Sequence, residues 1–271
     1  GWDVLTYDYR GIGESRQGSL NGLKADWIDW GQKDFEGALQ QAAARFPRQA
    51  IDVVAHSIGG FVIGLAPSAH RIRRIFTMGA QFAYWRDYLP EKRRGMYWRW
   101  HVLMPLLAHI LGHVPAKRLG WMEDTPKGVA LDWARMTPRF EDSVRRGVRT
   151  ADGTPEALAL ARNFGRVTAP ILALGVDDDP YGTEAALNRL LRYFQASERY
   201  QLRIAPSDAG LAQIGHFAFF HERFRETLWP YALEWLETGR PPGRLPGRVT
   251  VMPAQDPAGF DVDEGMAPCM D

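Results

Sequence analysis

The sequence predicts an α/β protein, with a mostly parallel sheet covered by helices on both faces. Two observations lead to this prediction. Short runs of β-branched and apolar residues alternate with stretches that repeat apolar side chains at helical spacing, as in βαβ units. In addition, the run Ile-Asp-Val-Val-Ala at 51–55 is apolar after its aspartate, as expected for a strand that is covered on both faces.

The predicted strands bear the β-branched and aromatic side chains that favour extended backbone. They cover residues 3–8, 51–55, 72–79, 170–176 and 200–205. A helix is predicted after the first strand, since Phe35, Leu39 and Phe46 recur at helical spacing before Pro47. Thr183 can cap a second helix after the fourth strand.

The C-terminal part of the chain contains one more helical pattern, followed by a change in composition. Apolar side chains recur from Phe220 to Trp235, and this helix is expected to be kinked or split near Pro230. Residues 239–271 are rich in proline and glycine and lack periodicity, which predicts a disordered tail.

Residues 81–166 interrupt the alternation of strands and helices. They contain aromatic-rich helical pieces separated by prolines, and no convincing strand. An insertion between two strands of a parallel sheet usually covers the carboxyl edge of that sheet, where binding sites lie. The predicted organisation is therefore a core of residues 1–80 and 167–238, with 81–166 as a helical cap.

Composition limits the possible partners and compartments. The 271 residues carry a net charge of +1, which argues against nucleic acid as the main partner. Cys269 is the single cysteine, so an intrachain disulfide is impossible and a reducing, cytoplasmic location is expected. The chain starts at Gly1 within an apolar run, so the question of a targeting signal upstream of Gly1 stays open. The most apolar run, residues 96–112, is short and interrupted by polar residues, so no transmembrane segment is predicted.

Ser57 is the predicted nucleophile. It follows the second predicted strand and precedes an apolar helical pattern, in the sequence Ala-His-Ser-Ile-Gly-Gly. A strand that turns abruptly into a helix needs small residues two before and two after the turn, and Ala55 and Gly59 meet this need. The N–H of Ile58 could then help to hold an oxyanion. The alternative is a serine that only caps a helix at a Gly-rich packing turn.

A nucleophilic serine needs a base and an acid that orients the base. In α/β folds of this kind, they follow the serine in the order acid, then histidine, on loops after later strands. The fourth strand ends at Asp177–Asp179, and His216 follows the fifth strand. His56 and His221 are expected to be packing or surface residues, with His221 as the reserve base.

Two further patterns are too weak to predict a cofactor or a metal. Gly11 and Gly13 follow a strand, but Arg16 stands where a dinucleotide site would have its third glycine. His109 and His113 are four apart, yet no glutamate follows His109, and a proline and a glycine make the helix doubtful. We therefore expect neither a cofactor nor a bound metal.

These motifs together resemble the α/β-hydrolase superfamily, and most closely a bacterial family of predicted α/β-hydrolases. The residues that carry the resemblance include YDYRGIGES, VVAHSIGGFVIGL, DDPYGT and IGHFAFFHERFRETLWP. The resemblance implies that Ser57 is the nucleophile and His216 the base. Asp179 matches the usual acid because it directly precedes Pro180, whereas counting three residues from Gly175 gives Asp178, so both stay open.

The resemblance also implies strands that precede this chain, with a loop that supplies a second oxyanion N–H. The chain starts at what resembles the fourth strand of the superfamily. Residues 3–8 are then expected to lie near an open sheet edge. The chain alone is expected to be poorly soluble and weakly active, and the upstream segment to restore both properties.

The predicted function is hydrolysis of an ester or similar acyl bond through an acyl-enzyme, with a small, partly apolar acyl substrate. Some of the aromatic side chains of the cap are expected to face Ser57, unless they serve only to hold the cap in place. The five aromatic side chains are Trp85, Tyr97, Trp98, Trp100 and Trp121. Two alternatives stay open, acyl transfer to a nucleophile other than water and a non-catalytic binding protein on the same fold.

Overall fold

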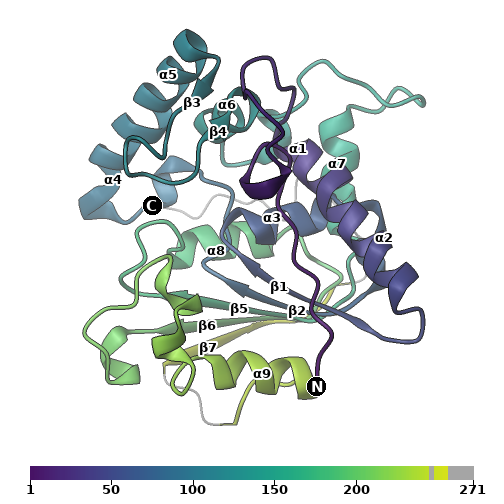
Figure 1. Ribbon diagram of the computed structural model, residues 1–271. Helices are drawn as coiled ribbons and strands as arrows, with labels where there is room; N and C mark the ends of the chain where they lie inside the picture. The colour runs from purple at the N-terminus through teal and green to yellow at the C-terminus, as the bar shows by residue number, and fades with distance from the viewer. Residues whose placement is uncertain (244–246, 256–271) are drawn as a thin grey trace.

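The computed structural model describes residues 1–243 and 247–255. Its centre is a five-stranded sheet in the order β1-β2-β5-β6-β7 (Figure 1). The strands are β1 (Ile51–His56), β2 (Ile72–Met78), β5 (Ile171–Val176), β6 (Arg199–Ile204) and β7 (Arg248–Met252). The first four are parallel, and every residue of β5 is buried. The predicted fold class is confirmed.

The predicted strand at residues 3–8 is wrong. The segment is extended but belongs to no ladder, and β2 is the one ladder partner that β1 has among the described residues. A strand requires hydrogen bonds to a neighbouring backbone. Here side chains of the segment, among them Leu5 and Tyr7, line a cavity of about 200 Å³ that also borders β1 and Phe35, so the two backbones do not pair.

The predicted disordered tail is wrong in part. Arg248–Met252 forms β7, which pairs antiparallel with β6 and closes that edge of the sheet. The unpaired backbone of β6 would otherwise be exposed. The Arg248 guanidinium also pairs with Glu184 at 2.6 Å. Residues 244–246 and 256–271 of the expected tail lie outside the described residues.

Helices cover both faces of the sheet. On one side lie α1 (Trp27–Asp29), α2 (Glu36–Arg45), α3 (Ile58–Leu65), α7 (Glu156–Phe164) and α8 (Glu184–Leu191), and on the other lies α9 (Trp229–Thr238) (Figure 1). A π-helical stretch, η2 (Trp30–Phe35), joins α1 to α2, so this helix begins earlier than predicted. The Thr183 hydroxyl caps α8 as predicted, since it accepts the Ala186 N–H.

Short 3-10 helices fill several connections. They are η1 (Gly13–Ser15), η3 (Pro67–Arg71), η4 (Trp85–Asp87), η6 (Phe140–Asp142), η7 (Pro206–Ala209), η8 (Ala218–Phe220) and η9 (Glu222–Phe224). The last apolar stripe is therefore divided, and α9 begins at Trp229 rather than running through Pro230 with a kink. Proline fits the first turn because its missing N–H would have no helical partner there.

The insertion has an apolar core of its own. It contains α4 (Pro90–Tyr97), the π-helical η5 (Trp98–Leu103), α5 (Met104–Leu111) and α6 (Lys127–Arg135). A small antiparallel ladder, β3 (His113–Val114) with β4 (Thr125–Pro126), was not predicted. At the end of the inserted residues, α7 returns to the main core, where a Cβ on Gly64 would lie 2.1 Å from the Phe164 ring. Among the described residues, no helix is both long and apolar enough to cross a bilayer.

Candidate active site

Ser57 lies at the turn between β1 and α3 in a strained backbone conformation. Its φ is 53° and its ψ is −124°, a region that residues other than glycine rarely occupy. The neighbours must be small for this turn to form. A Cβ on Gly60 would lie 2.4 Å from the Ala80 Cβ, whereas one on Gly59 would meet Ala55 at 3.4 Å. The glycine next to the predicted small position is therefore the one with the least room.

His216 and Asp179 lie next to Ser57. The His216 Nε2 atom is 2.9 Å from the Ser57 Oγ, and its Nδ1 is 2.7 Å from Asp179 Oδ2. An ionised carboxylate can only accept, so Nδ1 carries the proton and Nε2 is free to accept the serine proton. Asp179 is fully buried and His216 is 6% exposed, which keeps water away from this hydrogen bond.

The surroundings of Asp179 favour its ionised form. Burial opposes ionisation, but the hydrogen bond and charge of His216 and two backbone N–H groups outweigh it, so the pKa of Asp179 lies below its usual value. Those N–H groups belong to Tyr181 and Gly182, at 2.8 and 2.9 Å from Oδ1. Gly79 leaves room for the pair, since a Cβ there would lie 2.8 Å from Asp179 Oδ2.

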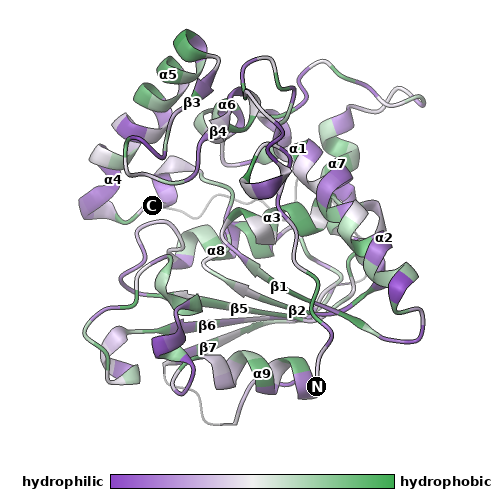
Figure 2. Cartoon of the chain, in the orientation of Figure 1, coloured by the Kyte–Doolittle hydropathy of each residue, from purple (hydrophilic) through white to green (hydrophobic). Residues whose placement is uncertain are grey.

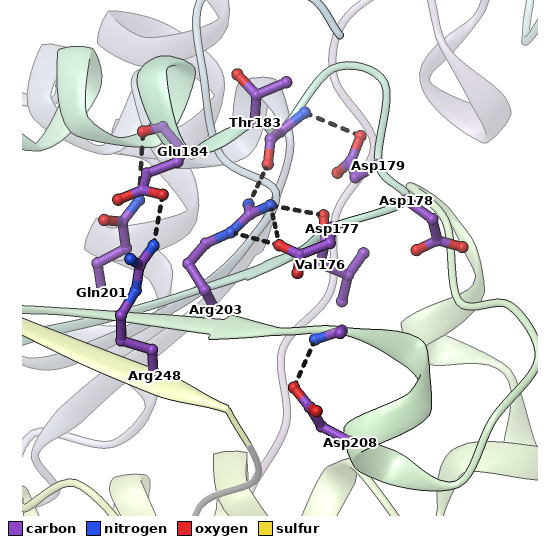
Figure 3. A network of polar contacts seen from close by, with 12 residues as sticks. Val176, Asp177, Asp178, Asp179, Thr183, Glu184, Gln201, Arg203, Asp208 and Arg248 are labelled. Carbon is purple, nitrogen blue, oxygen red and sulfur yellow. Dashed lines mark hydrogen bonds and ion pairs between the residues drawn. The ribbon is translucent and has the colours of Figure 1, made fainter.

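The side chains of the three consecutive aspartates after β5 point in different directions (Figure 3). Asp177 pairs with the Arg203 guanidinium of β6 at 2.7 Å. Asp178 accepts the N–H groups of Ile214 and Gly215, each at 2.9 Å, and so holds the loop that carries His216. Of the two candidate acids, the structure brings Asp179 to His216.

His56 supports the far side of His216. Its Nε2 donates to the His216 carbonyl at 2.7 Å, and the two rings lie 4.6 Å apart. Burial, together with the nearby charge of His216, lowers the pKa of His56 to about 4. His56 is therefore neutral at neutral pH and adds no charge beside His216. His221 is exposed and does not border the cavity at Ser57.

Gln81 lies beside Ser57 and was not predicted as a site residue. Its Oε1 accepts the Ala83 N–H, which fixes the orientation of the amide and leaves Nε2 as the atom facing Ser57, 3.4 Å from Oγ. Gln81 is 4% exposed, and Ala83 has a positive φ of 61°. Its place in the loop just after β2, at the carboxyl end of a parallel strand, is the sequence signal that could have indicated it.

Ser57 borders a mostly apolar cavity of about 350 Å³. Its wall combines core residues with residues of the insertion. They include Tyr9, Ile12, Trp27, Trp30, His56, Ile58, Gln81, Met122, Val129, Trp133, Tyr181 and Phe217. A cavity of this kind suits an apolar group that reaches the serine hydroxyl.

The prediction that some of the five named cap aromatics face Ser57 is wrong, because none of them borders the cavity. The alternative, in which they only hold the cap together, agrees with their packing. Trp100 stacks on Trp133 at 5.1 Å, and Trp133 of α6 is the one that reaches the cavity. Trp85 packs on Tyr97 at 4.9 Å, and Trp121 packs on Trp100 at 5.1 Å. Trp100 is buried in the insertion's own core, behind Trp133, whereas Trp98 is 66% exposed on the outside of the same helix.

Asp132 lies where the insertion meets the main core. Its Oδ2 accepts the Trp27 N–H at 3.1 Å. Burial, and then the nearby charge of Asp26, raise the pKa of Asp132 to about 7. Arg145 lies close to Asp26, 3.0 Å from its Oδ2, and offsets these effects only in part. Above neutral pH the interface therefore holds a partly buried, ionised carboxylate.

We expect Asp132→Asn to stabilise the protein at pH 8. A carboxyl with a raised folded pKa makes the free energy of unfolding fall as pH rises from about 4 to about 7, because the folded state holds a proton that the unfolded state has lost. Three pKa units correspond to at most ~4 kcal/mol. Asparagine keeps the acceptor for Trp27 and removes the charge. Urea unfolding at pH 5 and pH 8 measures the effect.

The exposed Asp142 serves as the control, since its side chain is 60% accessible. Asp142→Asn should show no gain in stability that grows with pH. If Asp132→Asn is no more stable than the parent at pH 8, the ionised carboxylate does not destabilise this interface.

A family model described as the alpha/beta hydrolase family matches residues 1–258. The chain belongs to the α/β hydrolase family. The resemblance inferred from the sequence is confirmed at this level. No curated protein matches the sequence of this α/β hydrolase.

Solved structures similar to this α/β hydrolase include a monoacylglycerol lipase from Paleococcus ferrophilus, at 11% identity and TM-score 0.45, covering 77% of this chain and 76% of that one. Est816, an N-acyl homoserine lactone degrading enzyme, has 15% identity and TM-score 0.44, with 86% and 80% covered. A thermophilic esterase from Thermogutta terrifontis has 15% identity and TM-score 0.43, with 85% and 78% covered. These likenesses concern the fold alone.

No group of three or more His, Cys, Asp or Glu side chains in the described ranges of this α/β hydrolase is arranged to hold a metal ion.

Proposed function

We propose that this α/β hydrolase cleaves an ester or similar acyl bond through an acyl-enzyme formed on Ser57. The observation that carries the proposal is the hydrogen-bonded series Ser57, His216 and Asp179 at an apolar cavity. Membership of the family supports hydrolysis in general, and the ester as substrate is part of the proposal.

In the first half-reaction, Ser57 Oγ attacks the acyl carbon while its proton passes to His216 Nε2. The tetrahedral intermediate collapses, the bond to the leaving group breaks, and His216 returns the proton to that group. In the second half-reaction, water loses a proton to His216 and attacks the acyl carbon, and the serine leaves with that proton. Asp179 holds the Nδ1–H tautomer and stabilises the imidazolium in both halves.

Two donors are available for the charge that develops on the carbonyl oxygen. The Ile58 N–H belongs to the first residue of α3, where backbone N–H groups have no partner within the helix. The Gln81 Nε2–H lies at 3.4 Å from the attacking oxygen, so it can reach an oxygen that is bonded to the same carbon. We include Gln81 in the proposed oxyanion site together with Ile58.

We expect Gln81→Glu to lower kcat by ~10², the loss typical of one oxyanion donor, with little change in KM. Glutamate keeps an oxygen for the Ala83 N–H but presents no N–H to the reacting carbonyl. Stopped-flow measurement of nitrophenyl ester hydrolysis, with Tm measured in parallel, tests this expectation.

Gln81→Ala serves as the companion variant, because it removes both the donor and the acceptor. It should lower Tm as well as kcat, since Ala83 would lose the bond that holds its positive φ. Wild-type turnover in Gln81→Glu would remove Gln81 from the oxyanion site.

We also propose that residues 81–166 act as a cap over the cavity. Seven residues of the insertion border it, namely Gln81, Ala83, Met122, Glu123, Thr125, Val129 and Trp133. The cavity wall is mostly apolar, so the favoured substrate is a small molecule with an apolar acyl or alcohol part. The tail of the insertion, α7, packs against α3 rather than over the cavity.

The direct test is covalent labelling of the 271-residue chain with a fluorophosphonate, followed by peptide mapping and by hydrolysis of a panel of nitrophenyl esters. Modification of Ser57 together with ester hydrolysis supports the proposal. Labelling without hydrolysis, but with transfer of the acyl group to an added alcohol, would favour the acyltransferase alternative. If the chain shows no labelling and no turnover, the result would favour a non-catalytic binding protein.

A further inference from the structure

The outer surface of the insertion is formed by one long helix. α4, η5 and α5 follow one another without a break from Pro90 to Leu111. Its buried seam repeats every four residues and faces the core of the insertion. The seam consists of Met96, Trp100, Met104 and Ala108, each at most 8% exposed. This packing accounts for one side of the helix and leaves the opposite side to the solvent.

The opposite side is also apolar. Leu103, Leu106 and Ile110 lie at positions i, i+3 and i+7, which is one stripe of a helix. Leu106 is 52% exposed and Ile110 is 69% exposed, and Trp98 nearby is 66% exposed. In Figure 2, α5 is mostly green and lies at the outer margin of the molecule, next to the largely purple α4. Several large apolar side chains exposed along one helix indicate an interaction surface.

The segment that carries this stripe is also rich in positive charge. Residues 90–120 contain six lysines and arginines but one acidic residue, so they carry a charge of +5, and the rest of the chain carries −4. Most of the basic side chains are exposed. The exposed ones are Lys92, Arg94, Arg99, Lys117 and Arg118. Lys117 pairs with Glu123 at 3.3 Å, in a contact that is itself exposed and therefore weak.

We propose that this helix docks on the surface of an anionic phospholipid bilayer. A helix lies in a membrane interface when apolar residues enter the acyl boundary while basic residues contact the phosphate headgroups. The stripe from Leu103 to Ile110 and the basic residues around it meet both conditions. The inference concerns a surface outside the Ser57 cavity and does not depend on the proposed hydrolysis.

Charge favours a lipid surface over a second copy of the chain. A two-fold contact places the same patch of both copies face to face. It would bring Arg94 and Arg99 of each copy towards the basic residues of the other, which is repulsive. An anionic bilayer instead offers negative charge over the whole patch, and this attraction weakens when salt screens it.

The test is flotation of the 271-residue chain with extruded vesicles at low salt. We expect binding to vesicles of phosphatidylcholine with about 30% phosphatidylglycerol, at least tenfold weaker binding to phosphatidylcholine alone, and a similar loss in 0.5 M NaCl. The double variant Leu106→Gln with Ile110→Gln should abolish binding to the vesicles. The double variant Arg94→Gln with Arg99→Gln should remove the part of the binding that salt weakens. The exposed Leu233 on α9 provides the control Leu233→Gln, which should bind like the parent.

Light scattering measures the oligomeric state of the parent and the variants, and hydrolysis of a water-soluble ester measures whether their active site is intact. Every variant lies outside the Ser57 cavity and should hydrolyse a water-soluble ester at the parental rate. No difference between the two vesicle types, or binding that survives in Leu106→Gln with Ile110→Gln, would overturn the proposal. A dimer that this double variant dissociates, without vesicle binding by the parent, would assign the stripe to a second copy instead.

Discussion

Replacing Ser57 with alanine is expected to lower kcat for a nitrophenyl ester by ~10⁶, the size of effect seen when a serine hydrolase of the triad type loses its nucleophile. Alanine cannot form the acyl-enzyme, while the cavity and the oxyanion donors stay in place. Fluorophosphonate labelling should disappear in the same variant. The fold should be unaffected, because the Ser57 side chain makes hydrogen bonds only with His216 and Gln81 among the described residues.

Ser207→Ala provides the matched control for this change. Ser207 is exposed in the η7 turn and does not line the cavity. Its variant should label and hydrolyse like the parent. Equal labelling of Ser57→Ala and the parent would mean that a different residue is the nucleophile, and peptide mapping would then identify it.

The second large effect is expected for Asp179→Asn, with a loss of ~10⁴ in kcat, as for the equivalent change in a serine protease. The asparagine keeps one oxygen for the N–H groups of Tyr181 and Gly182. Its NH₂ group then faces His216 Nδ1, which forces the proton onto Nε2. A histidine in that tautomer cannot accept the proton of Ser57, so turnover falls while the geometry is preserved.

Asp178→Asn separates the two candidate acids. Asp178 accepts two backbone N–H groups of the loop before His216, and one of its two acceptor oxygens survives as the amide oxygen. We expect this change to lower the free energy of unfolding by ~1.5–3 kcal/mol, the contribution of a hydrogen bond to a charged group. Its kcat should stay within about tenfold of the parent. A greater loss of kcat in Asp178→Asn than in Asp179→Asn would reverse the assignment of the acid.

Local features of the chain were sufficient to predict the parallel sheet and the turn at Ser57. β1, β2, β5 and β6 were predicted because each concentrates β-branched, aromatic or other apolar side chains within six or seven residues. Only the structure shows that β5 is buried throughout, whereas Val54 of β1 is 49% exposed. The turn at Ser57 was predicted because it requires small residues at positions close to it in sequence, namely Ala55, Gly59 and Gly60. The order of serine, aspartate and histidine follows from the order of the strands, since parallel strands end at one edge of the sheet.

Some features depend on contacts between distant residues and were missed or predicted wrongly. Residues 3–8 have strand-like composition, yet extended backbone becomes a strand only when a neighbour pairs with it. Arg248–Met252 contains β-branched residues, but it lies within a proline- and glycine-rich tail, and the open edge of β6 gives it a partner. The cap aromatics were expected at the cavity, but the packing of the insertion's own core placed Trp133 there instead.

The sequence by itself therefore determined the fold class, the nucleophile candidate and the two candidate acids, because each depends on short-range pattern. Only the tertiary structure decided which acid reaches His216. Three consecutive aspartates point in three directions set by the turn after β5 and by partners 26 to 37 residues further along the chain. The same holds for Gln81, whose amide is aimed at Ser57 by the N–H of Ala83 in a strained loop. A pattern of residue types does not encode the direction of a side chain, because that direction results from contacts between segments that only the folded chain brings together.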